Sequence, residues 1–377
     1  MHTLETPSTY ATPQMNGTDR SDLPMVTILT PAYNEEELIV RNLKRIYEYM
    51  EAREDRYRWE ILVVNDGSKD QTAELADAFS IKHPKMRVIH HVVNRNLGGA
   101  LRTGFQNAKG DYVIVLDLDL SYDVDHIDAL MLEALKADAD VVVASPYMKG
   151  GKSTKVPKTR LLLSRVVNKF MSWSAPNTDI RTFTGMVRVY KRSFLRQLNL
   201  KSNTYSINPE IILKTLILRG RIREIPAHLD WSFQEDAGGR VSSIKIFKGI
   251  AAGLMASFIF RPYAFFMVIG LLLLLTSLYM VGWIFINVAD MYPIIEGTTG
   301  GYFDDRFSMA IGKVFQDRPH AFFIGGVSLL ISLQFLSIGF LSLQSKRYFD
   351  ELFHINTTNL RNILEARDQQ SGESSAE

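Results

Sequence analysis

Cysteine is absent from the 377 residues of this chain. Its absence excludes disulfide bonds, thiolate metal sites, iron–sulfur clusters and cysteine nucleophiles. An excess of charge of one sign is also missing, because 43 Lys and Arg residues stand against 41 Asp and Glu residues. Nucleic-acid-binding proteins usually carry a strong positive field, so we expect no nucleic-acid partner.

Apolar stretches are missing from both ends of the chain. Residues 1–22 are rich in Ser, Thr and Pro, which predicts a disordered tail and no signal peptide. The last ten residues, 368–377, are equally polar, and we expect disorder there too. The length between these tails exceeds that of one ordinary domain, so at least two structural units are expected.

Charged residues are missing from two long runs nearer the C-terminus. Ala264–Val288 spans 25 residues and Ala321–Leu343 spans 23 residues without an acidic or basic side chain. At about 1.5 Å per helical residue, each run exceeds the roughly 30 Å hydrocarbon core of a bilayer. We therefore predict an integral membrane protein with two transmembrane helices, about 264–288 and 321–343, within a membrane unit of residues 263–345.

The charges that flank these runs predict their orientation. Lysines and arginines lie just before the first run and just after the second, at positions 245, 248, 261, 346 and 347. Cytoplasmic segments carry the excess of Lys and Arg, so both termini are predicted to be cytoplasmic, with 289–320 as an external loop and 346–377 as a cytoplasmic tail. Apolar residues at helical spacing make 241–262 a predicted interfacial amphipathic helix in contact with membrane lipids. Packing of this segment against the first span is the alternative.

The remaining part, residues 23–240, is predicted to be an α/β domain. Short β-rich runs alternate with helical segments: strands are expected at 26–29, 60–64, 87–91, 112–116 and 141–144, and helices from about residues 35, 69, 98 and 123. This alternation predicts a parallel sheet with helices on both faces. Ligands of such sheets bind beyond the carboxyl ends of the strands, so the polar clusters 31–35, 65–68, 94–99 and 117–119 are expected to converge there.

Asp117 and Asp119 are candidate metal ligands after the fourth of these strands. Their spacing places both carboxylates on the same side of an extended chain. Hard oxygen ligands suit Mg²⁺ or Mn²⁺, which keep further positions for water and substrate phosphates. Capping of a turn is the alternative for this pair. Asp66 belongs to a predicted turn into a helix, and within that turn it stays free to accept a hydrogen bond from a ligand base or ribose.

The segment from Val141 to Thr178 contains no acidic residue but seven cations, at positions 149, 152, 155, 158, 160, 165 and 169. Near a membrane such a cluster attracts anionic head groups and phosphates. A solvated basic surface is the alternative interpretation.

Four motifs carry a resemblance to a known family. They are PAYNE at 31–35, VVNDGSKDQT at 63–72, NRNLGGALRTG at 94–104 and LDLDLSYD at 116–123, followed by the basic segment and the two apolar runs. Together they resemble a family 2 inverting glycosyltransferase, and within it the dolichyl- and polyprenyl-phosphate sugar synthases. The resemblance implies a nucleotide-sugar-binding glycosyltransferase A-type (Rossmann-like) domain with a C-terminal two-helix transmembrane hairpin.

The activity implied by the resemblance is inverting transfer of a sugar from a UDP- or GDP-linked donor to a polyprenyl phosphate, at the cytoplasmic membrane face. The resemblance implies that the nucleoside is held by Pro31, Tyr33, Glu35 and Asp66. It further implies that Asp117 and Asp119 hold Mg²⁺ or Mn²⁺ on the donor diphosphate and that Arg160 contacts phosphate. Lys149, Arg188 and Arg240 are additional candidates for phosphate or acceptor contacts.

The chain departs from the family pattern at two positions. Ser121 stands where a glutamine often adds a metal contact, and Pro146 replaces an arginine of the resembling synthases. A glycosyltransferase acting on a sugar or lipid hydroxyl therefore stays open, although the Gln-x-x-Arg-Trp motif of processive synthases is missing. A non-catalytic membrane adaptor that retains the fold is a further alternative. The sequence leaves open the sugar, the base, the acceptor length, what replaces the arginine at Pro146, and assembly into a homo-oligomer.

Overall fold

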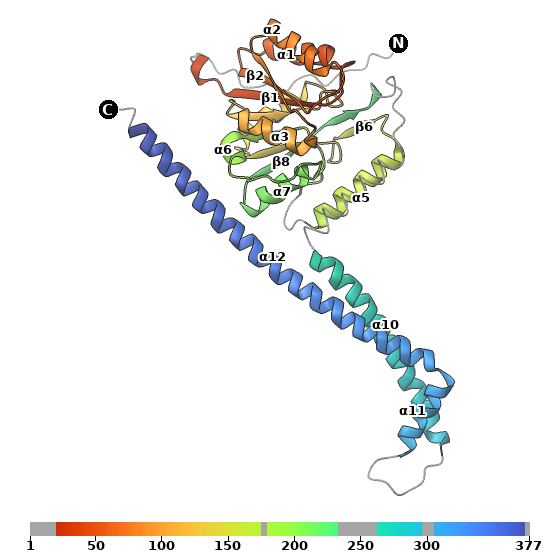
Figure 1. Ribbon diagram of the computed structural model, residues 1–377. Coiled ribbons are helices and arrows are strands. Elements are labelled where there is room, and N and C mark those ends of the chain that lie inside the picture. Colours follow the sequence, from red (N-terminus) through yellow and green to blue (C-terminus); the bar gives the residue numbers. More distant parts are fainter. Residues whose placement is uncertain (1–19, 175–178, 233–261, 296–304, 374–377) are drawn as a thin grey trace. The chain divides into compact units, whose positions relative to one another are not determined.

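The computed structural model describes residues 20–174, 179–232, 262–295 and 305–373 (Figure 1). Predictions for the tail before residue 20 and for the amphipathic segment up to residue 261 lie outside these ranges. The chain divides into two compact units. One consists of Met1–Ser257 with Phe353–Glu377, and the other of Phe258–Leu352.

The first unit is built on a seven-stranded sheet with the order β3-β2-β1-β4-β7-β5-β8. Its strands are β1 (Met25–Ala32), β2 (Arg58–Asn65), β3 (Met86–His90), β4 (Tyr112–Val115), β5 (Val141–Ser145), β7 (Arg188–Lys191) and β8 (Ile222–Pro226). The five strands expected from the sequence are all present. In parallel register Ala32 lies opposite Asn65, and Asn65 opposite His90, so the carboxyl ends of β1, β2 and β3 meet at one edge.

The sheet is mixed, so the prediction of a wholly parallel sheet is wrong at β7. This strand runs antiparallel to both β4 and β5, between which it lies. The chain enters it from the carboxyl end of β5, because the Thr182 hydroxyl lies 2.6 Å from that of Ser145, the last residue of β5. Starting from that end, β7 can only run opposite to β5.

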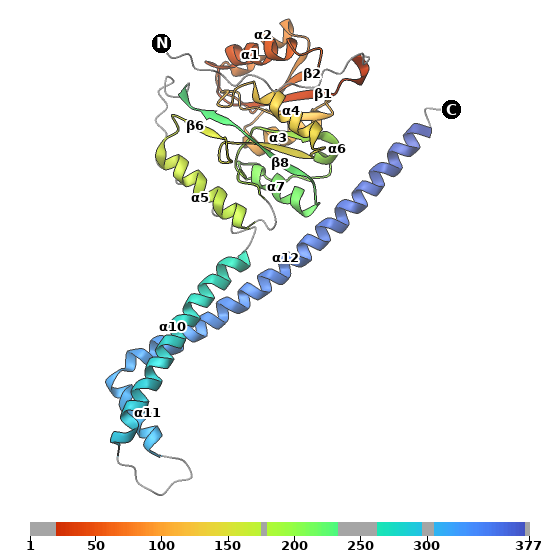
Figure 2. The same cartoon turned by 180° about the vertical axis from the view of Figure 1, so that it is seen from behind.

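Helices cover both faces of the sheet (Figures 1 and 2). The α-helices between residues 39 and 217 are α1 (Ile39–Glu51), α2 (Thr72–Lys82), α3 (Asn96–Asn107), α4 (His126–Lys136), α5 (Lys158–Ser174), α6 (Arg192–Leu195) and α7 (Ile207–Ile217). On one face, apolar residues of α1 and α4 share a core with Val26 and Ile28 of β1. On the other face α3 packs so closely that a Cβ on Gly104 would lie 2.3 Å from Leu29 Cδ1. The alternation of side chains along β1 thus serves two cores.

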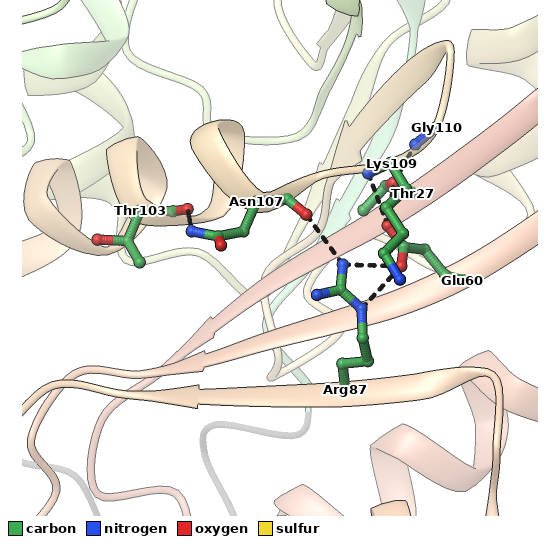
Figure 3. Close-up of polar contacts among 7 residues, drawn as sticks. All are labelled: Thr27, Glu60, Arg87, Thr103, Asn107, Lys109 and Gly110. Atoms are coloured by element: carbon green, nitrogen blue, oxygen red, sulfur yellow. Dashed lines mark hydrogen bonds and ion pairs between the residues drawn. The ribbon is translucent and has the colours of Figure 1, made fainter.

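The amino-terminal side of the sheet is held by a buried polar network around Glu60 of β2 (Figure 3). Its Oε1 accepts hydrogen bonds from the Thr27 hydroxyl and the Lys109 amide, both at 2.8 Å. Its Oε2 accepts from Arg87 Nε at 3.0 Å and Nη2 at 2.8 Å. Both oxygens are therefore satisfied, as a buried carboxylate requires.

A small parallel sheet of β6 (Lys152–Thr154) and β9 (His228–Asp230) lies beside the large one. The Tyr122–Leu229 bridge connects β9 to the segment that follows β4. This pairing brings the first turns of the basic segment next to the residues that follow β8, a proximity that matters for the site.

The second unit contains the two apolar helices. These are α10 (Pro262–Met291) and the first part of α12 (Pro319–Glu373), with a 3₁₀ turn η2 (Tyr292–Ile294) and α11 (Asp305–Asp317) between them. Both are long and apolar enough to cross a membrane. They pack together, since the Ser277 hydroxyl donates to the Gly325 carbonyl at 2.9 Å and a Cβ on Gly339 would lie 2.7 Å from Met267 Cγ.

Two predictions for this region need correction. The connection between the apolar helices was expected to be a loop, but it contains α11. The end of the chain was expected to be disordered from residue 368, whereas α12 continues to Glu373. Its last part is rich in Leu, Glu, Arg, Ala and Gln, which favour helix even where the segment is polar.

Candidate functional site

The predicted polar clusters meet at the rim, by which we mean the edge formed by the carboxyl ends of β1, β2 and β4. The loop after β1 is joined to the loop after β2, because the Asn34 amide donates to Ser68 Oγ at 3.0 Å and the Glu35 amide to Thr72 Oγ1 at 2.8 Å. The Arg95 amide, in the third cluster, donates to Asp66 Oδ1 at 2.8 Å.

The fourth cluster is fixed by α1. Asn42 Nδ2 donates to the Leu118 carbonyl at 2.8 Å, between the two candidate metal ligands. All four clusters therefore belong to one site, as expected from parallel strands.

The chain turns at Asp117 and Asp119, which corrects the expectation of an extended segment. The Leu120 amide donates to the Asp117 carbonyl at 3.1 Å, and Leu120 adopts a left-handed conformation with φ of 50°. That conformation costs a non-glycine residue about 1–3 kcal/mol, and it persists where packing enforces it. The buried Leu120 side chain supplies the packing. The two carboxylates still influence one another in this turn, because the charge of Asp119 raises the pKa of Asp117.

Electrostatics show that the carboxylates of Glu35, Asp117 and Asp119 lie near each other; we call them the carboxylate cluster. Burial, followed by the charges of Asp119 and Glu35, raises the pKa of Asp117 to about 8. Burial, followed by the charges of Asp119 and Asp70, raises the pKa of Glu35 to about 7. Like charges that cannot both ionise cheaply create a strong demand for a cation.

Few protein groups stabilise the negative charge of these carboxylates. Within the described ranges, no hydrogen bond reaches the side-chain oxygens of Asp117 or Glu35, and Arg160 is the cation whose charge lowers the pKa of Asp117. The same residues contain no group of three or more His, Asp or Glu side chains placed to hold a metal. The donor set therefore fits a divalent ion that takes two protein carboxylates and completes its shell with water and substrate phosphate.

The nucleoside candidates lie on the same rim. Pro31 is the penultimate residue of β1, and Tyr33 follows it with 41% of its surface exposed. Asp66 is buried just beyond β2, where its Oδ1 also lies 2.6 Å from Nδ1 of His91. His91 was not among the sequence candidates, because its partner lies 25 residues earlier and only the register of β2 with β3 brings them together.

Arg160 belongs to the first turn of α5, and its guanidinium lies 4.0 Å above the ring of Trp231. Its charge interacts with those of Asp117 and Asp119. The helix is anchored by the Tyr147 hydroxyl, which donates to Ser164 Oγ at 2.7 Å. The site thus combines carboxylates that call for a cation with a guanidinium able to bind an anion.

Sequence reasoning missed two aromatic residues beside Arg160. Trp231 follows β9, and only the pairing of β6 with β9 places it near α5. Tyr205 lies within electrostatic range of both Arg160 and Asp117. Trp231 is one of only four tryptophans in the chain, which is the one signal that could have drawn attention to it.

Two of the remaining candidates lie in the described residues, and Arg188 begins β7 opposite Val115, the last residue of β4. Arg188 is fully buried in β7, where it donates to the Asn208 carbonyl at 2.9 Å and the Phe183 carbonyl at 2.7 Å, so the expected phosphate contact does not fit its position. Lys149 is exposed in the loop after β5 and forms no ion pair with the described residues. Arg240 lies outside the described residues.

The departures from the family pattern have definite places. Pro146, which stands for the expected arginine, is buried directly after β5. Ser121 is buried too, and its amide donates to Asp119 Oδ1 at 2.9 Å. Ser121 thus orients a carboxylate of the cluster through its backbone.

A separate pocket of about 280 Å³ opens at the amino-terminal end of β4, lined by residues that include Asp111, Lys191 and Arg196. It contains none of the candidate site residues.

The chain is similar to known glycosyltransferases. The family described as glycosyl transferase family 2 matches residues 27–198. Dolichyl-phosphate beta-glucosyltransferase ALG5C of Trichomonas vaginalis is 25% identical over 58% of this chain and 67% of its own length. Dolichol-phosphate mannosyltransferase of Pyrococcus furiosus is 36% identical over 37% of this chain, and the chain spans only 38% of that relative.

Two further comparisons extend this picture. Polyprenol monophosphomannose synthase of Mycolicibacterium smegmatis is 31% identical over 46% of this chain and 64% of its own length. Among solved structures, mannosyltransferase PcManGT from Pyrobaculum calidifontis, in complex with GDP-Man and Mn²⁺, superposes with a TM-score of 0.42. It is 17% identical, and the superposition covers 94% of this chain and 91% of that one.

Proposed function

We propose that this glycosyltransferase, which belongs to glycosyl transferase family 2, moves a sugar from a nucleotide-sugar donor to a polyprenyl phosphate at the cytoplasmic face of a membrane. The observation that carries the proposal is the pairing of the carboxylate cluster with Arg160 at one rim. The carboxylate cluster would bind the cation of a donor diphosphate, and Arg160 would bind a second phosphate. Relatives named for transfer to dolichyl or polyprenyl phosphates support the same acceptor class.

The acceptor determines how much catalysis the protein must provide. A phosphate monoester has its second pKa near ~6 and is mostly dianionic at neutral pH, so its oxygen attacks without a general base. This oxygen forms a bond to the anomeric carbon while the bond from that carbon to the donor diphosphate breaks, with inversion. Nucleoside diphosphate leaves with the bonding electron pair.

The chain's own residues position both reactants. Pro31, Tyr33, Glu35 and Asp66 would hold the nucleoside, with the exposed Tyr33 ring able to lie against a base. Asp117 and Asp119 would hold Mg²⁺ or Mn²⁺, which when bound neutralises charge growing on the leaving diphosphate. Arg160 binds the acceptor phosphate through two parallel N–H donors.

Membrane attachment fits an acceptor with a long apolar tail. The two apolar helices are proposed to span the bilayer, with the catalytic domain and both termini on the cytoplasmic side and residues 289–320 outside. Tags at residues 5 and 370 of the chain should then be protected in intact cells, and a tag near Gly300 should be accessible. Access to the tag at residue 370 would contradict this topology.

The decisive experiment compares a polyprenyl phosphate with the corresponding free polyprenol. Purified full-length protein in vesicles receives Mn²⁺ and a panel of radiolabelled nucleotide-sugars, and label is counted in the lipid extract. We expect label in lipid only with the phosphate, and none with the Asp119→Asn variant. Equal transfer to polyprenol would instead support a hydroxyl acceptor, and absence of transfer from every donor would favour the adaptor alternative.

A further inference from the structure

Asp66 presents only one of its two carboxylate oxygens to the rim. Oδ1 already has two partners, His91 Nδ1 at 2.6 Å and the Arg95 amide at 2.8 Å. Oδ2 has no hydrogen-bond partner among the residues that the structure describes. It is also not among the fully buried side-chain atoms left without a partner, so it meets solvent. Asp66 can therefore offer a ligand one strong acceptor atom.

His91 fixes the orientation of the Asp66 carboxylate. An ionised carboxylate only accepts, so Nδ1 carries the hydrogen toward Asp66. The other ring nitrogen, Nε2, lies 2.9 Å from the Thr103 hydroxyl on α3. With a partner on each nitrogen and both side chains almost fully buried, at 4% exposure for His91 and 5% for Asp66, the ring cannot turn away.

The backbone donor to Oδ1 is fixed equally well. Gly67 has φ of 67°, and a Cβ there would lie 2.8 Å from both the Asn94 nitrogen and the Val93 carbonyl carbon. The loops after β2 and β3 are thus in backbone contact directly beside Asp66. The Arg95 amide cannot withdraw from Oδ1 unless that contact opens.

From this geometry we infer that the donor base is recognised through Oδ2 of Asp66 alone, and that the site therefore selects uracil over guanine. Uracil offers one ring N–H between two carbonyl groups, which needs one acceptor. Guanine offers a ring N–H and an amino N–H side by side, which match both oxygens of a carboxylate. With Oδ1 filled by His91 and Arg95, one of the two guanine donors has no carboxylate oxygen to pair with.

This inference rests on the proposed function, because it concerns the nucleoside of the same donor. It adds that the donor is a uridine diphosphate sugar and that His91 is a positioning residue that sets base specificity. We expect UDP to bind at least tenfold more tightly than GDP.

The test is calorimetric titration of the full-length protein in detergent with UDP and with GDP, in the presence of Mn²⁺. A clear UDP preference supports the inference. Equal or tighter binding of GDP overturns it while leaving glycosyl transfer intact. Failure of both nucleotides to bind would count against the proposed function as well, so the two outcomes are distinguishable.

Variants of the two adjacent histidines sharpen the test. His91→Ala frees Oδ1, so the ratio of UDP to GDP affinity should fall at least threefold. His90→Ala is the matched control, because His90 contacts Asn65 and Asp77 and does not touch Asp66. In His90→Ala the ratio of UDP to GDP affinity should stay at the wild-type value. An equal fall of this ratio in both variants would overturn the role of His91. If His91→Ala does not fold, Thr103→Val removes the support at Nε2, and an unchanged ratio there would count against that role.

Discussion

Two regions of the same sheet contain buried carboxylates, and they are treated in opposite ways. Near the amino ends of the strands, Glu60 receives hydrogen bonds from Thr27, Lys109 and Arg87 (Figure 3). At the rim, Asp117 and Glu35 receive none from described residues and repel each other instead. A satisfied carboxylate supports the fold, whereas carboxylates that receive no hydrogen bond, as Asp117 and Glu35 do not from the described residues, gain most from a bound ligand.

The largest effect is expected at the rim and on turnover. Asp119→Asn removes a charge that we propose acts on the donor side, so turnover should fall at least ~100-fold, about 2.7 kcal/mol of barrier, while the protein stays folded. Lipid-extractable label measures the rate, and thermal unfolding checks the fold. Asp125→Asn, at an exposed acid before α4, is the control and should keep full activity. Undiminished turnover of Asp119→Asn, or of wild type in EDTA, would contradict this role.

Substitution of Glu60 should lower the stability of the protein without changing its turnover. Glu60→Ala strands the Arg87 guanidinium and two further donors, so the free energy of unfolding should fall by about 2–4 kcal/mol. Denaturant unfolding measures the loss. Turnover per folded molecule should stay near wild type, and a selective loss of turnover would erase the contrast between the two regions.

Substitution of Arg160 tests whether the basic segment binds phosphate specifically or is only a basic surface. If Arg160 binds phosphate as we propose, its planar guanidinium makes two bonds that a lysine cannot reproduce, so Arg160→Lys should reduce lipid-dependent turnover by about tenfold or more, and a neutral substitution by ~10²-fold. Neutral substitutions at Lys152 and Lys155, measured at moderate salt, are the controls and should cost little. Comparable small losses at all three positions would remove Arg160 from the site.

The convergence of the rim loops was predictable because it depends only on local patterns. Strand ends are recognisable from β-rich runs, and parallel strands bring their carboxyl ends together. The motif residues Asp66 and Asp117 could therefore be predicted to lie at one edge of the sheet before any contact was known.

What the sequence concealed depends on register and on long-range pairing. β7 was missed, and its first residue, Arg188, was a candidate for a phosphate contact, although its two terminal guanidinium nitrogens donate to buried backbone carbonyl groups. The partners of Asp66 and Arg160, namely His91 and Trp231, are set by strand pairs whose members lie far apart in the chain. No local pattern specifies such pairs.

The smallest expected effect is on the stability of the metal-free protein. Ionised Asp117 lowers this stability, whereas ionised Glu60 raises it. The folded state holds a proton on Asp117 up to about pH 8, whereas an unfolded carboxyl releases it near its ordinary value of 3.8. Folded protein therefore binds more protons between these values, and stability in EDTA should fall as pH rises from about 5 to 8. Added Mn²⁺ should restore it, because bound metal favours the ionised carboxylates.

Asp117→Asn removes this penalty together with the charge. At pH 8 in EDTA the variant should be more stable than wild type by about 1 kcal/mol, a modest gain because the residue Asp117 is only partly buried. At pH 5, where wild type holds the proton, the difference should nearly vanish. Thermal unfolding at both pH values, with and without Mn²⁺, measures it. A variant that is less stable than wild type at pH 8 would mean that Asp117 is satisfied within the fold as Glu60 is, and the contrast between the two regions would be lost.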